Sequence, residues 1–427
     1  MNLSERDSKV IWHPYTQMQT AELPVAIVRG EGARLYDEDG KEYIDAISSW
    51  WVNVHGHANR YIGQKIHEQL QVLEHVIFAG FTHQPAVELA ERLIKVLPQN
   101  QSRIFYSDDG STAVEVAVKM ALQYWYNQGI NKKTIVAFRN SYHGDTFGAM
   151  SVSERDIFTA PFRDLLFDVA FIDAPLKGIE RESLDQLERE LQKENVAAFI
   201  FEPLLQGAGG MIVYEAPPLD ELIYFCREKG IPTIADEVLT GFGRTGKFFA
   251  SDYLKNKPDI ICMSKGITGG TMPFGATSCT EKVYEAFLSD DRKKTFFHGH
   301  SYTGNPAACA AALASLDLFE KPGTWDNIRR IESSHREFLS RIRNHPIVEK
   351  PRQIGTIMAF DAKCGEQTSY LHSLRDRMSH FCLTHGVIIR PLGNIIYFMP
   401  PYCITDEELS RVYSTIQAML LEIDNLK

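Results

Sequence analysis

Residues 259–271 read Asp259-Ile-Ile-Cys-Met-Ser-Lys265-Gly-Ile-Thr-Gly-Gly-Thr271, an apolar run followed by a lysine and a glycine-rich turn. The run from Ile260 to Met263 predicts a buried strand of a parallel sheet, because both faces of such a strand are covered. Lys265 then lies at the carboxyl end of this strand, where open α/β sheets bind their ligands. A lysine amine forms Schiff bases with carbonyl compounds. The alternative, a solvated lysine at a strand end, is not excluded by this stretch alone.

A second apolar run lies about thirty residues upstream and ends in a carboxylate. It reads Gly230-Ile-Pro-Thr-Ile-Ala-Asp236-Glu237-Val238. A lysine and an aspartate at neighbouring strand ends suit pyridoxal 5'-phosphate (PLP), because the lysine holds the aldehyde and the aspartate keeps the pyridine nitrogen protonated. An aspartate that merely caps a loop would explain Asp236 but not the pair. We therefore expect PLP as the cofactor, with Lys265 and Asp236 as its catalytic partners.

The composition is that of an ordinary soluble protein, with 427 residues, 44% hydrophobic and 23% charged, and a net charge of −10. This charge, without any basic run of five residues, argues against nucleic acid or an anionic membrane as a partner. The charged N-terminus lacks a signal-peptide pattern, and no eighteen-residue apolar stretch is present, so we expect a cytoplasmic protein. The seven cysteines are scattered without a CxxC, which predicts buried apolar residues rather than disulfides or a zinc site.

Helices and buried strands are expected to alternate from residue 59 onward. Before that point, Asp39-Gly40 predicts the turn of a hairpin. Helices are expected over 59–76 and 85–97, and a helix of small residues over 307–318. From Trp325 the composition shifts to an amphipathic helix and then to a strand-rich α+β unit. The expected strands are 103–107, 134–138, 197–201, 233–235, 260–262 and 274–279.

A strand, a glycine turn and a helix start follow one another at residues 103–115. Thr112 and Glu115 have the spacing of a capping box, which predicts the helix start. The amides of Gly110 and Ser111 at such an N-terminus make a phosphate site, although many strand-to-helix turns look alike. Tyr142, just beyond the strand 134–138, is a candidate to stack on a pyridine ring.

Two further patterns favour other ligands but lack the context that those ligands need. Gly241-Phe-Gly-Arg-Thr-Gly246 matches the dinucleotide fingerprint GxGxxG, but no helix pattern follows it, so we do not expect NAD. The triplets His55-Gly-His57 and His298-Gly-His300 lack the helical i, i+4 spacing of a metal pair, and we expect no metal.

Arg390 interrupts the apolar stretch 386–399. An arginine in such a stretch usually meets a carboxylate in a bidentate pair, which is either that of a substrate or that of an internal salt bridge. The last helix is expected to begin at Thr405-Asp-Glu-Glu408, a second capping box.

Several of these motifs together resemble the class III (subgroup II) PLP-dependent aminotransferases, over nearly the whole chain from Trp12 to the final helix. The motifs that carry the resemblance are Asp236-Glu237, Gly241–Gly246, Ser264-Lys265-Gly266 and Gly304-Asn-Pro306. Within that class the chain is similar to the adenosylmethionine-8-amino-7-oxononanoate aminotransferases of biotin biosynthesis. The motifs for that group are Trp12-His-Pro-Tyr15-Thr, Ser48-Ser-Trp50-Trp51, Tyr142–Gly148, Gln206-Gly-Ala-Gly-Gly210 and Arg390-Pro-Leu-Gly.

The resemblance implies the α/β type I fold of PLP-dependent transferases. Its large domain has a mostly parallel mixed sheet flanked by helices, and its smaller α+β domain is built from both termini. The expected division is residues 1–58 as an N-terminal segment of the small domain, 59–322 as the large PLP-binding domain and 323–427 as the C-terminal small domain.

The resemblance also assigns residues to the site. Lys265 would hold the cofactor and move the proton, Asp236 would pair with the pyridinium nitrogen and Tyr142 would cover the ring. The phosphate would be bound by Gly110 and Ser111, with His300 and Ser301 of the partner subunit, so a homodimer with sites at the interface is implied. The substrate residues would be Tyr15, Trp50, Tyr142, Lys265, Gly299 and Tyr397, with Arg390 on the carboxylate of the keto acid.

The implied reaction transfers an amino group from S-adenosylmethionine to 8-amino-7-oxononanoate and gives 7,8-diaminononanoate by a ping-pong mechanism. Tyr15 and the paired tryptophans favour S-adenosylmethionine as the donor. The loop at His300-Ser301 instead looks like that of lysine-using members. A lysine-dependent enzyme and another class III ω-aminotransferase are therefore the alternatives.

Overall fold

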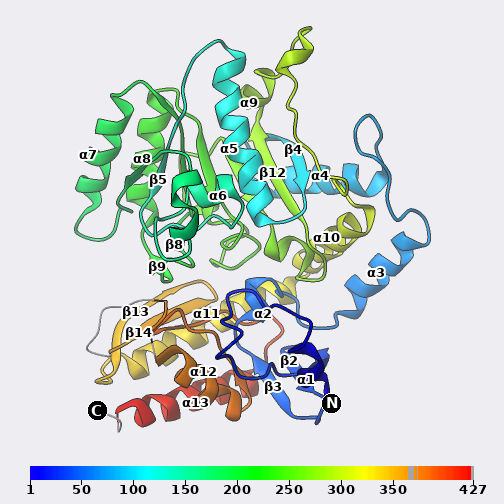
Figure 1. Ribbon diagram of the computed structural model, residues 1–427, viewed down its shortest axis with the longest axis vertical. Helices are drawn as coiled ribbons and strands as arrows, with labels where there is room; N and C mark the ends of the chain where they lie inside the picture. The colour runs from blue at the N-terminus through cyan, green and yellow to red at the C-terminus, as the bar shows by residue number, and fades with distance from the viewer. Residues whose placement is uncertain (364–369, 373, 425–427) are drawn as a thin grey trace.

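The computed structural model describes residues 1–363, 370–372 and 374–424. Its upper part in Figure 1 is a large sheet with helices on both sides, and its lower part collects segments from both ends of the chain. The hairpin strands β2 (Arg34–Asp37) and β3 (Glu42–Asp45) lie in the same lower part as the last helix, α13 (Asp406–Asp424). Segments from the two ends of the sequence therefore lie in the same part of the molecule.

The large sheet has seven strands in the order β4-β12-β11-β10-β7-β5-β6. β12 runs antiparallel to both of its neighbours, and the other pairings are parallel, which confirms the predicted mostly parallel mixed sheet. The strands are β4 (Gln101–Ser107), β5 (Thr134–Phe138), β6 (Val169–Ile172), β7 (Val196–Phe201), β10 (Thr233–Asp236), β11 (Ile260–Met263) and β12 (Gly275–Thr280). Six of the seven were predicted. β6 was missed because it is an edge strand of four residues, three of them only partly buried.

The pairing of β10 with β11 fixes the geometry of the predicted lysine and aspartate. Asp236 lies opposite Cys262 in the parallel register. Both strands therefore end at the same edge of the sheet, and Lys265 follows β11 by two residues. The edge is the carboxyl end of the parallel strands, where α/β folds place ligands.

Helices cover both faces of this sheet. They include α4 (Gln84–Val96), α5 (Gly110–Asn127), α6 (Phe147–Ser151), α7 (Glu180–Leu191), α8 (Ala216–Glu228), α9 (Glu281–Glu285) and α10 (Pro306–Phe319). Shorter pieces are the 3-10 helices at Ala160–Leu165, Ala250–Tyr253, Lys265–Thr268 and Arg292–Lys294, and the small pair β8 (Leu205–Gln206) with β9 (Ile212–Val213).

The start of α5 differs from the prediction. The capping box is formed by Asp109 and Thr112, three residues before the expected pair, and the helix begins at Gly110. The carboxylate of Glu115 instead accepts the backbone N–H of Gly148 at 2.6 Å. The capping box was misplaced because Asp109 is itself a strong N-cap residue, and tertiary contacts engage Glu115.

The lower part of the molecule contains two small sheets. One has the order β1-β2-β3-β15, with β1 (Ile27–Glu31) and β15 (Val387–Ile388), and the other joins β13 (Val348–Ile354), β14 (Ile357–Ala362) and β16 (Ile395–Phe398). The remaining helices are α1 (Leu3–Asp7), α2 (Ser48–Trp51), α3 (Arg60–Leu70), α11 (Pro322–Ile342) and α12 (Leu374–Thr384). The hairpin at Gly40 is confirmed by the antiparallel pairing of β2 with β3.

A parallel pairing of β3 with β15 joins the N-terminal hairpin to the C-terminal part of the chain. We propose on this basis that residues 1–58 and 323–427 form one small domain and that 59–322 form the large one. The long-range pairing supports this division because it covers the second edge of β3, which pairs with β2 on its other side.

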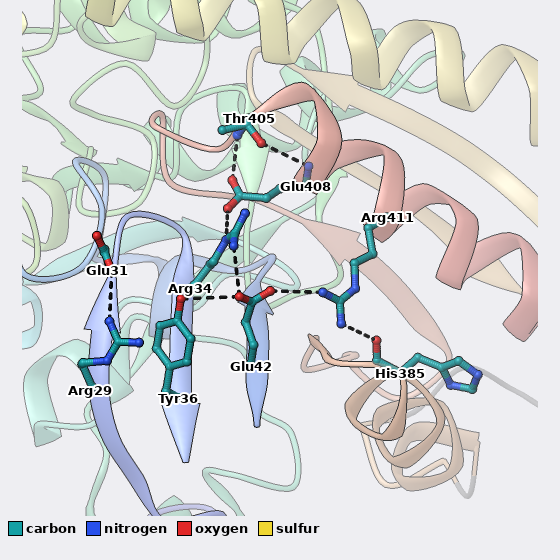
Figure 2. Close-up of polar contacts among 9 residues, drawn as sticks. All are labelled: Arg29, Glu31, Arg34, Tyr36, Glu42, His385, Thr405, Glu408 and Arg411. Atoms are coloured by element: carbon teal, nitrogen blue, oxygen red, sulfur yellow. Dashed lines mark hydrogen bonds and ion pairs between the residues drawn. The ribbon is translucent and has the colours of Figure 1, made fainter. Parts of the chain in front are cut away.

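Charged side chains also join the two ends of the chain, as Figure 2 shows. Arg34 binds Glu42 at 3.0 Å and Glu408 at 2.5 Å, and Arg411 binds Glu42 at 3.1 Å. We call these four residues the terminal ion network. Glu408 also accepts the backbone N–H of Thr405, and the hydroxyl of Thr405 accepts the N–H of Glu408, so the predicted capping box at the start of α13 is confirmed.

No helix in the described residues is long and apolar enough to cross a membrane. Five of the predicted buried cysteines are buried, at positions 226, 262, 279, 309 and 382. Cys403 is exposed, contrary to the prediction, and Cys364 lies outside the described residues.

Candidate active site

Lys265 begins the 3-10 helix that follows β11 and has a left-handed backbone conformation, with φ of 45°. This conformation is strained for a residue with a side chain and is common at functional sites. Its Nζ lies 5.0 Å from the centre of the Trp51 ring. Burial lowers the pKa of the Lys265 amine, against the carboxylates of Asp236 and Glu202, which raise it. A larger fraction of this amine is therefore neutral and nucleophilic than for an exposed lysine.

Asp236 is held in place by two hydrogen bonds. His143 Nδ1 donates to Asp236 Oδ2 at 2.7 Å, and the N–H of Val238 donates to Oδ1 at 3.0 Å. His143 is completely buried as a side chain, and its Nε2 has no hydrogen-bond partner in the described part of the chain. His143 was not among the predicted site residues.

Glu202 is a second buried carboxylate near Asp236 that the sequence analysis missed. It follows β7 directly, as Asp236 ends β10, and a polar residue after a fully buried strand is the signal that could have found it. Its oxygens accept the N–H of Tyr142 at 3.0 Å and of Gly207 at 2.8 Å. Burial raises the pKa of Glu202 to about 7. We call Asp236, His143 and Glu202 the buried acid group.

The first of two adjoining cavities has a volume of about 710 Å³ and brings together every cofactor residue predicted within one subunit. These residues are Gly110, Ser111, Tyr142, Asp236 and Lys265.

The N-terminus of α5 forms one end of this larger cavity. A Cβ added to Gly110 would lie 2.7 Å from a methyl group of Val238. Any residue other than glycine would therefore push the backbone or Val238 out of its present position. The hydroxyl of Ser111 accepts the N–H of Thr146 at 3.0 Å. Helix amides and hydroxyls at such an end are suited to a phosphate group.

These features fit PLP. The helix N-terminus suits its phosphate, the carboxylate of Asp236 suits its ring nitrogen, and the amine of Lys265 suits its aldehyde. The unpartnered Nε2 of His143 shows that the site is polar beyond the aspartate as well. The larger cavity can therefore hold the cofactor with a residue suited to its phosphate, its ring nitrogen and its aldehyde.

The second cavity, of about 270 Å³, shares Trp51, Tyr142, Ala208 and Lys265 with the first, and we call it the substrate cavity. Four predicted substrate residues line it in addition, namely Tyr15, Trp50, Arg390 and Tyr397. Lys265 thus lines both cavities and lies between the predicted cofactor residues and the predicted substrate residues.

Arg390 lies two residues beyond the end of β15, not inside a strand as the apolar stretch suggested. Its guanidinium lies 4.7 Å above the ring of Trp50, and no ion pair engages it among the described residues. The described residues therefore do not form the internal salt bridge that was one of the two hypotheses for Arg390. A guanidinium of this kind is available to bind a carboxylate in two-point contact.

Tyrosines at the boundary of the two cavities are linked through Asp145, which the sequence analysis did not assign. The hydroxyl of Tyr15 donates to Asp145 Oδ2 at 2.5 Å and lies 3.2 Å from the hydroxyl of Tyr142. Burial, with the nearby Asp145, raises the pKa of both tyrosines above the ordinary value. Both hydroxyls therefore stay protonated near neutral pH and serve as hydrogen-bond donors.

The loop residues Gly299, His300 and Ser301 do not line either cavity within one chain. His300 Nδ1 lies 3.7 Å from Asp108, and the carbonyl of Ser301 contacts His75 Nε2 at 2.5 Å. Their expected role in the site of the second subunit stays a prediction.

The GxGxxG motif and the first His-Gly-His triplet make contacts within the fold. No helix opens at Gly241–Gly246, and Arg244 within it is fully buried and donates to the carbonyl of Pro400 at 2.8 Å. His55 contacts Ser315, and His57 contacts Asp45. Across residues 1–363, 370–372 and 374–424 no group of three His, Cys, Asp or Glu side chains could hold a metal.

Comparison with known proteins identifies the family. The family described as Aminotransferase class-III matches residues 15–420. The chain belongs to the class III aminotransferase family. A relative from Synechococcus elongatus, named adenosylmethionine-8-amino-7-oxononanoate aminotransferase, is 47% identical over 421 residues, which cover 97% of this chain and 99% of the relative.

Solved structures of aminotransferases are similar to this chain over nearly its whole length. The crystal structure of an adenosylmethionine-8-amino-7-oxononanoate aminotransferase from Methanocaldococcus jannaschii is 36% identical, with a TM-score of 0.92, and covers 97% of this chain and 98% of that one. An amine transaminase from an uncultivated Pseudomonas species, solved in its PLP-bound form, is 31% identical, with a TM-score of 0.91, over 97% of this chain and 98% of the other. The type I fold and PLP as the cofactor of this class III aminotransferase are thereby confirmed.

Proposed function

We propose that this aminotransferase transfers an amino group from S-adenosylmethionine to 8-amino-7-oxononanoate, giving the 7,8-diaminononanoate of biotin biosynthesis. The observation that carries the proposal is that Lys265 lines two adjoining cavities whose other lining residues suit different chemical groups. One cavity offers a helix N-terminus and a carboxylate, and the other offers aromatic rings and a free guanidinium. Full-length relatives that bear the name of this reaction support the choice of substrates.

Bound in the larger cavity, PLP would supply an electrophilic aldehyde and a protonated ring that withdraws electrons from the reacting carbon. Asp236 would hold the proton on the ring nitrogen, since His143 and Val238 keep its carboxylate in one orientation. Lys265 Nζ would take a proton from the substrate carbon and return it, a role that its lowered pKa suits at neutral pH.

The substrate cavity would orient the keto acid by its two ends. Arg390 would bind the carboxylate, and the rings of Tyr15 and Trp50, 5.5 Å apart, would cover the aliphatic chain and exclude water. Trp51 donates to the hydroxyl of Tyr397 at 2.9 Å, which holds these two lining side chains in place. Holding the reacting atoms in one geometry is worth on the order of 7 kcal/mol in such reactions.

We propose further that the chain forms a homodimer in the cytoplasm and that the loop at Gly299–Ser301 completes the site of the second subunit. The exposed rings of Phe297 and Tyr302 on either side of this loop support an interface there, because large exposed aromatic side chains are typical of contact surfaces.

An absorbance spectrum of the purified protein with PLP tests the proposal. The visible band should bleach on addition of S-adenosylmethionine and should return when 8-amino-7-oxononanoate is added. Bleaching with lysine alone would replace the donor and keep the reaction. Bleaching by ω-amino acids, with recovery on 2-oxoglutarate and none on 8-amino-7-oxononanoate, would assign the chain to another class III activity.

A further inference from the structure

A third cavity, of about 220 Å³, opens beside the substrate cavity. The two share five wall residues, which are Tyr142, Phe158, Ala208, Tyr370 and Leu392. We call the third cavity the acidic annex, because Glu154 and Asp156 are the charged residues of its described lining. The substrate cavity has the opposite sign, with Lys265 and Arg390 as its charged residues.

The carboxylate of Asp156 is partly free. Its Oδ1 accepts the N–H of Phe158 at 2.9 Å and the N–H of Thr159 at 3.4 Å. Its Oδ2 accepts no hydrogen bond from any described residue, and no ion pair in that part of the chain engages Asp156 or Glu154. Arg155, between them, is not part of the lining and donates instead to the carbonyls of Met150 and Phe167.

Aromatic rings lead from Arg390 to the annex without a break. The guanidinium lies over Trp50, and successive ring centres are 5.5 Å, 5.7 Å and 4.8 Å apart. The rings in order are Trp50, Tyr15, Phe158 and Tyr370. Aromatic faces beside a carboxylate favour an organic cation over a neutral or anionic group.

Size points to a ligand that reaches beyond the substrate cavity. Its volume of about 270 Å³ is below the roughly 300 Å³ at which small-molecule sites usually begin. The keto acid is a thin aliphatic chain, whereas S-adenosylmethionine carries a purine nucleoside on a sulfonium centre. The annex adds space on the side where the lining becomes negative.

We propose that the acidic annex receives the positively charged side chain of the amino donor, with Asp156 Oδ2 facing the charge and Phe158 and Tyr370 beside it. The inference rests on the proposed function and deepens it, since it states why a cationic donor is selected. It applies to the sulfonium of S-adenosylmethionine and to the side-chain ammonium of lysine. The acceptor is expected to leave the annex empty.

The test compares half-reactions of the PLP-loaded protein by rapid mixing. S-adenosylhomocysteine is the matched probe, because it lacks the sulfonium methyl group and its charge and keeps the rest of the donor. Asp156→Asn is the matched variant, because the amide oxygen still accepts the two backbone N–H groups. Asp164→Asn, an exposed residue of the same segment that lines none of these cavities, is the control.

For the wild-type protein, S-adenosylmethionine should react at least about tenfold faster than S-adenosylhomocysteine. Asp156→Asn should slow S-adenosylmethionine about tenfold, leave S-adenosylhomocysteine within twofold, and leave the half-reaction with 8-amino-7-oxononanoate within twofold. A tenfold change corresponds to about 1.4 kcal/mol. Asp164→Asn should change none of these rates.

Equal rates for the two donors in the wild-type protein would overturn the inference. So would an unchanged rate with S-adenosylmethionine in Asp156→Asn, or equal losses in both half-reactions, which would make Asp156 a structural residue. If lysine and not S-adenosylmethionine reacts, the same variant should slow lysine about tenfold, and an unchanged rate overturns the inference. If neither cationic donor reacts with the wild-type protein, the proposed function fails, and the inference fails with it.

Discussion

The terminal ion network and the buried acid group use charge in different ways. In the terminal ion network each carboxylate meets an arginine, and the arginines are 39% and 46% exposed (Figure 2). In the buried acid group Asp236 binds His143, Glu202 accepts only backbone N–H groups, all three side chains are buried, and one histidine nitrogen has no described partner. Half-exposed pairs such as Arg411–Glu42 contribute little free energy, whereas buried polar groups without a partner are costly and cluster at functional sites.

This difference predicts that changes near the buried acid group alter the reaction and that changes in the terminal ion network alter only stability. The largest effect is expected for Lys265→Ala, which removes the amine that the two cavities share. The rate of the half-reaction with S-adenosylmethionine should fall by about 10⁴-fold, because no other described side chain takes over the proton transfer. Single-turnover absorbance measures this rate, with the exposed Lys255→Ala as the control. A residual rate within tenfold of wild type would contradict the role of Lys265.

Asp236→Asn should have the next largest effect. The amide keeps the shape and an acceptor for His143 but no longer stabilises a proton on the ring nitrogen. Both half-reactions should slow by about 100-fold at saturating substrate. Asp259→Asn is the matched control. Asp259 directly precedes the neighbouring strand β11, and its carboxylate accepts the N–H of Thr233 in β10. Equal losses in the two variants would show that the effect is structural.

Glu202→Gln should change the pH dependence of stability. The pKa of Glu202 is raised from 4.5 to about 7, so the folded state holds this proton more tightly than the unfolded state. Wild-type stability therefore falls, relative to the variant, as the pH rises from about 4.5 to about 7, by about 3 kcal/mol over the whole window. Urea unfolding of both proteins at pH 4.5, 6 and 8 measures the difference. A constant difference across these pH values would refute the assignment.

The smallest effect is expected in the terminal ion network. Arg411→Ala removes one exposed contact to Glu42 and should cost about 0.5 kcal/mol of unfolding free energy, less at high salt. The half-reaction rates should not change. A loss of more than about 2 kcal/mol, or a slower half-reaction, would show that the two charged groups do not differ in the way described.

The sequence predicted the parts of the site that follow local patterns. Lys265 and Asp236 stand directly after apolar strands, and Gly110 and Ser111 stand at a strand-to-helix turn, so their place at one edge of the sheet could be derived. Arg390 was expected to bind substrate because of the family resemblance, and it lines the smaller cavity beside Lys265, although the strand ends before it.

Other features of the fold and the site could not be predicted, because they depend on contacts between distant segments and have no distinctive local sequence pattern. Asp145 is hydrogen-bonded to Tyr15, 130 residues away in the sequence, and His143 is hydrogen-bonded to Asp236, 93 residues away. β6 is a half-buried edge strand whose pattern is weak. Glu202 is an exception, because it directly follows the fully buried strand β7 and so has the same local pattern as Asp236.

Transfer of labelled nitrogen tests the central claim most directly. The PLP-loaded protein would be incubated with 8-amino-7-oxononanoate and S-adenosylmethionine carrying ¹⁵N in its amino group, and in parallel with ¹⁵N-labelled lysine. Mass spectrometry of the product should show 7,8-diaminononanoate one mass unit heavier with labelled S-adenosylmethionine only. Label from lysine alone would overturn the choice of donor, and the absence of 7,8-diaminononanoate with either donor would contradict the account.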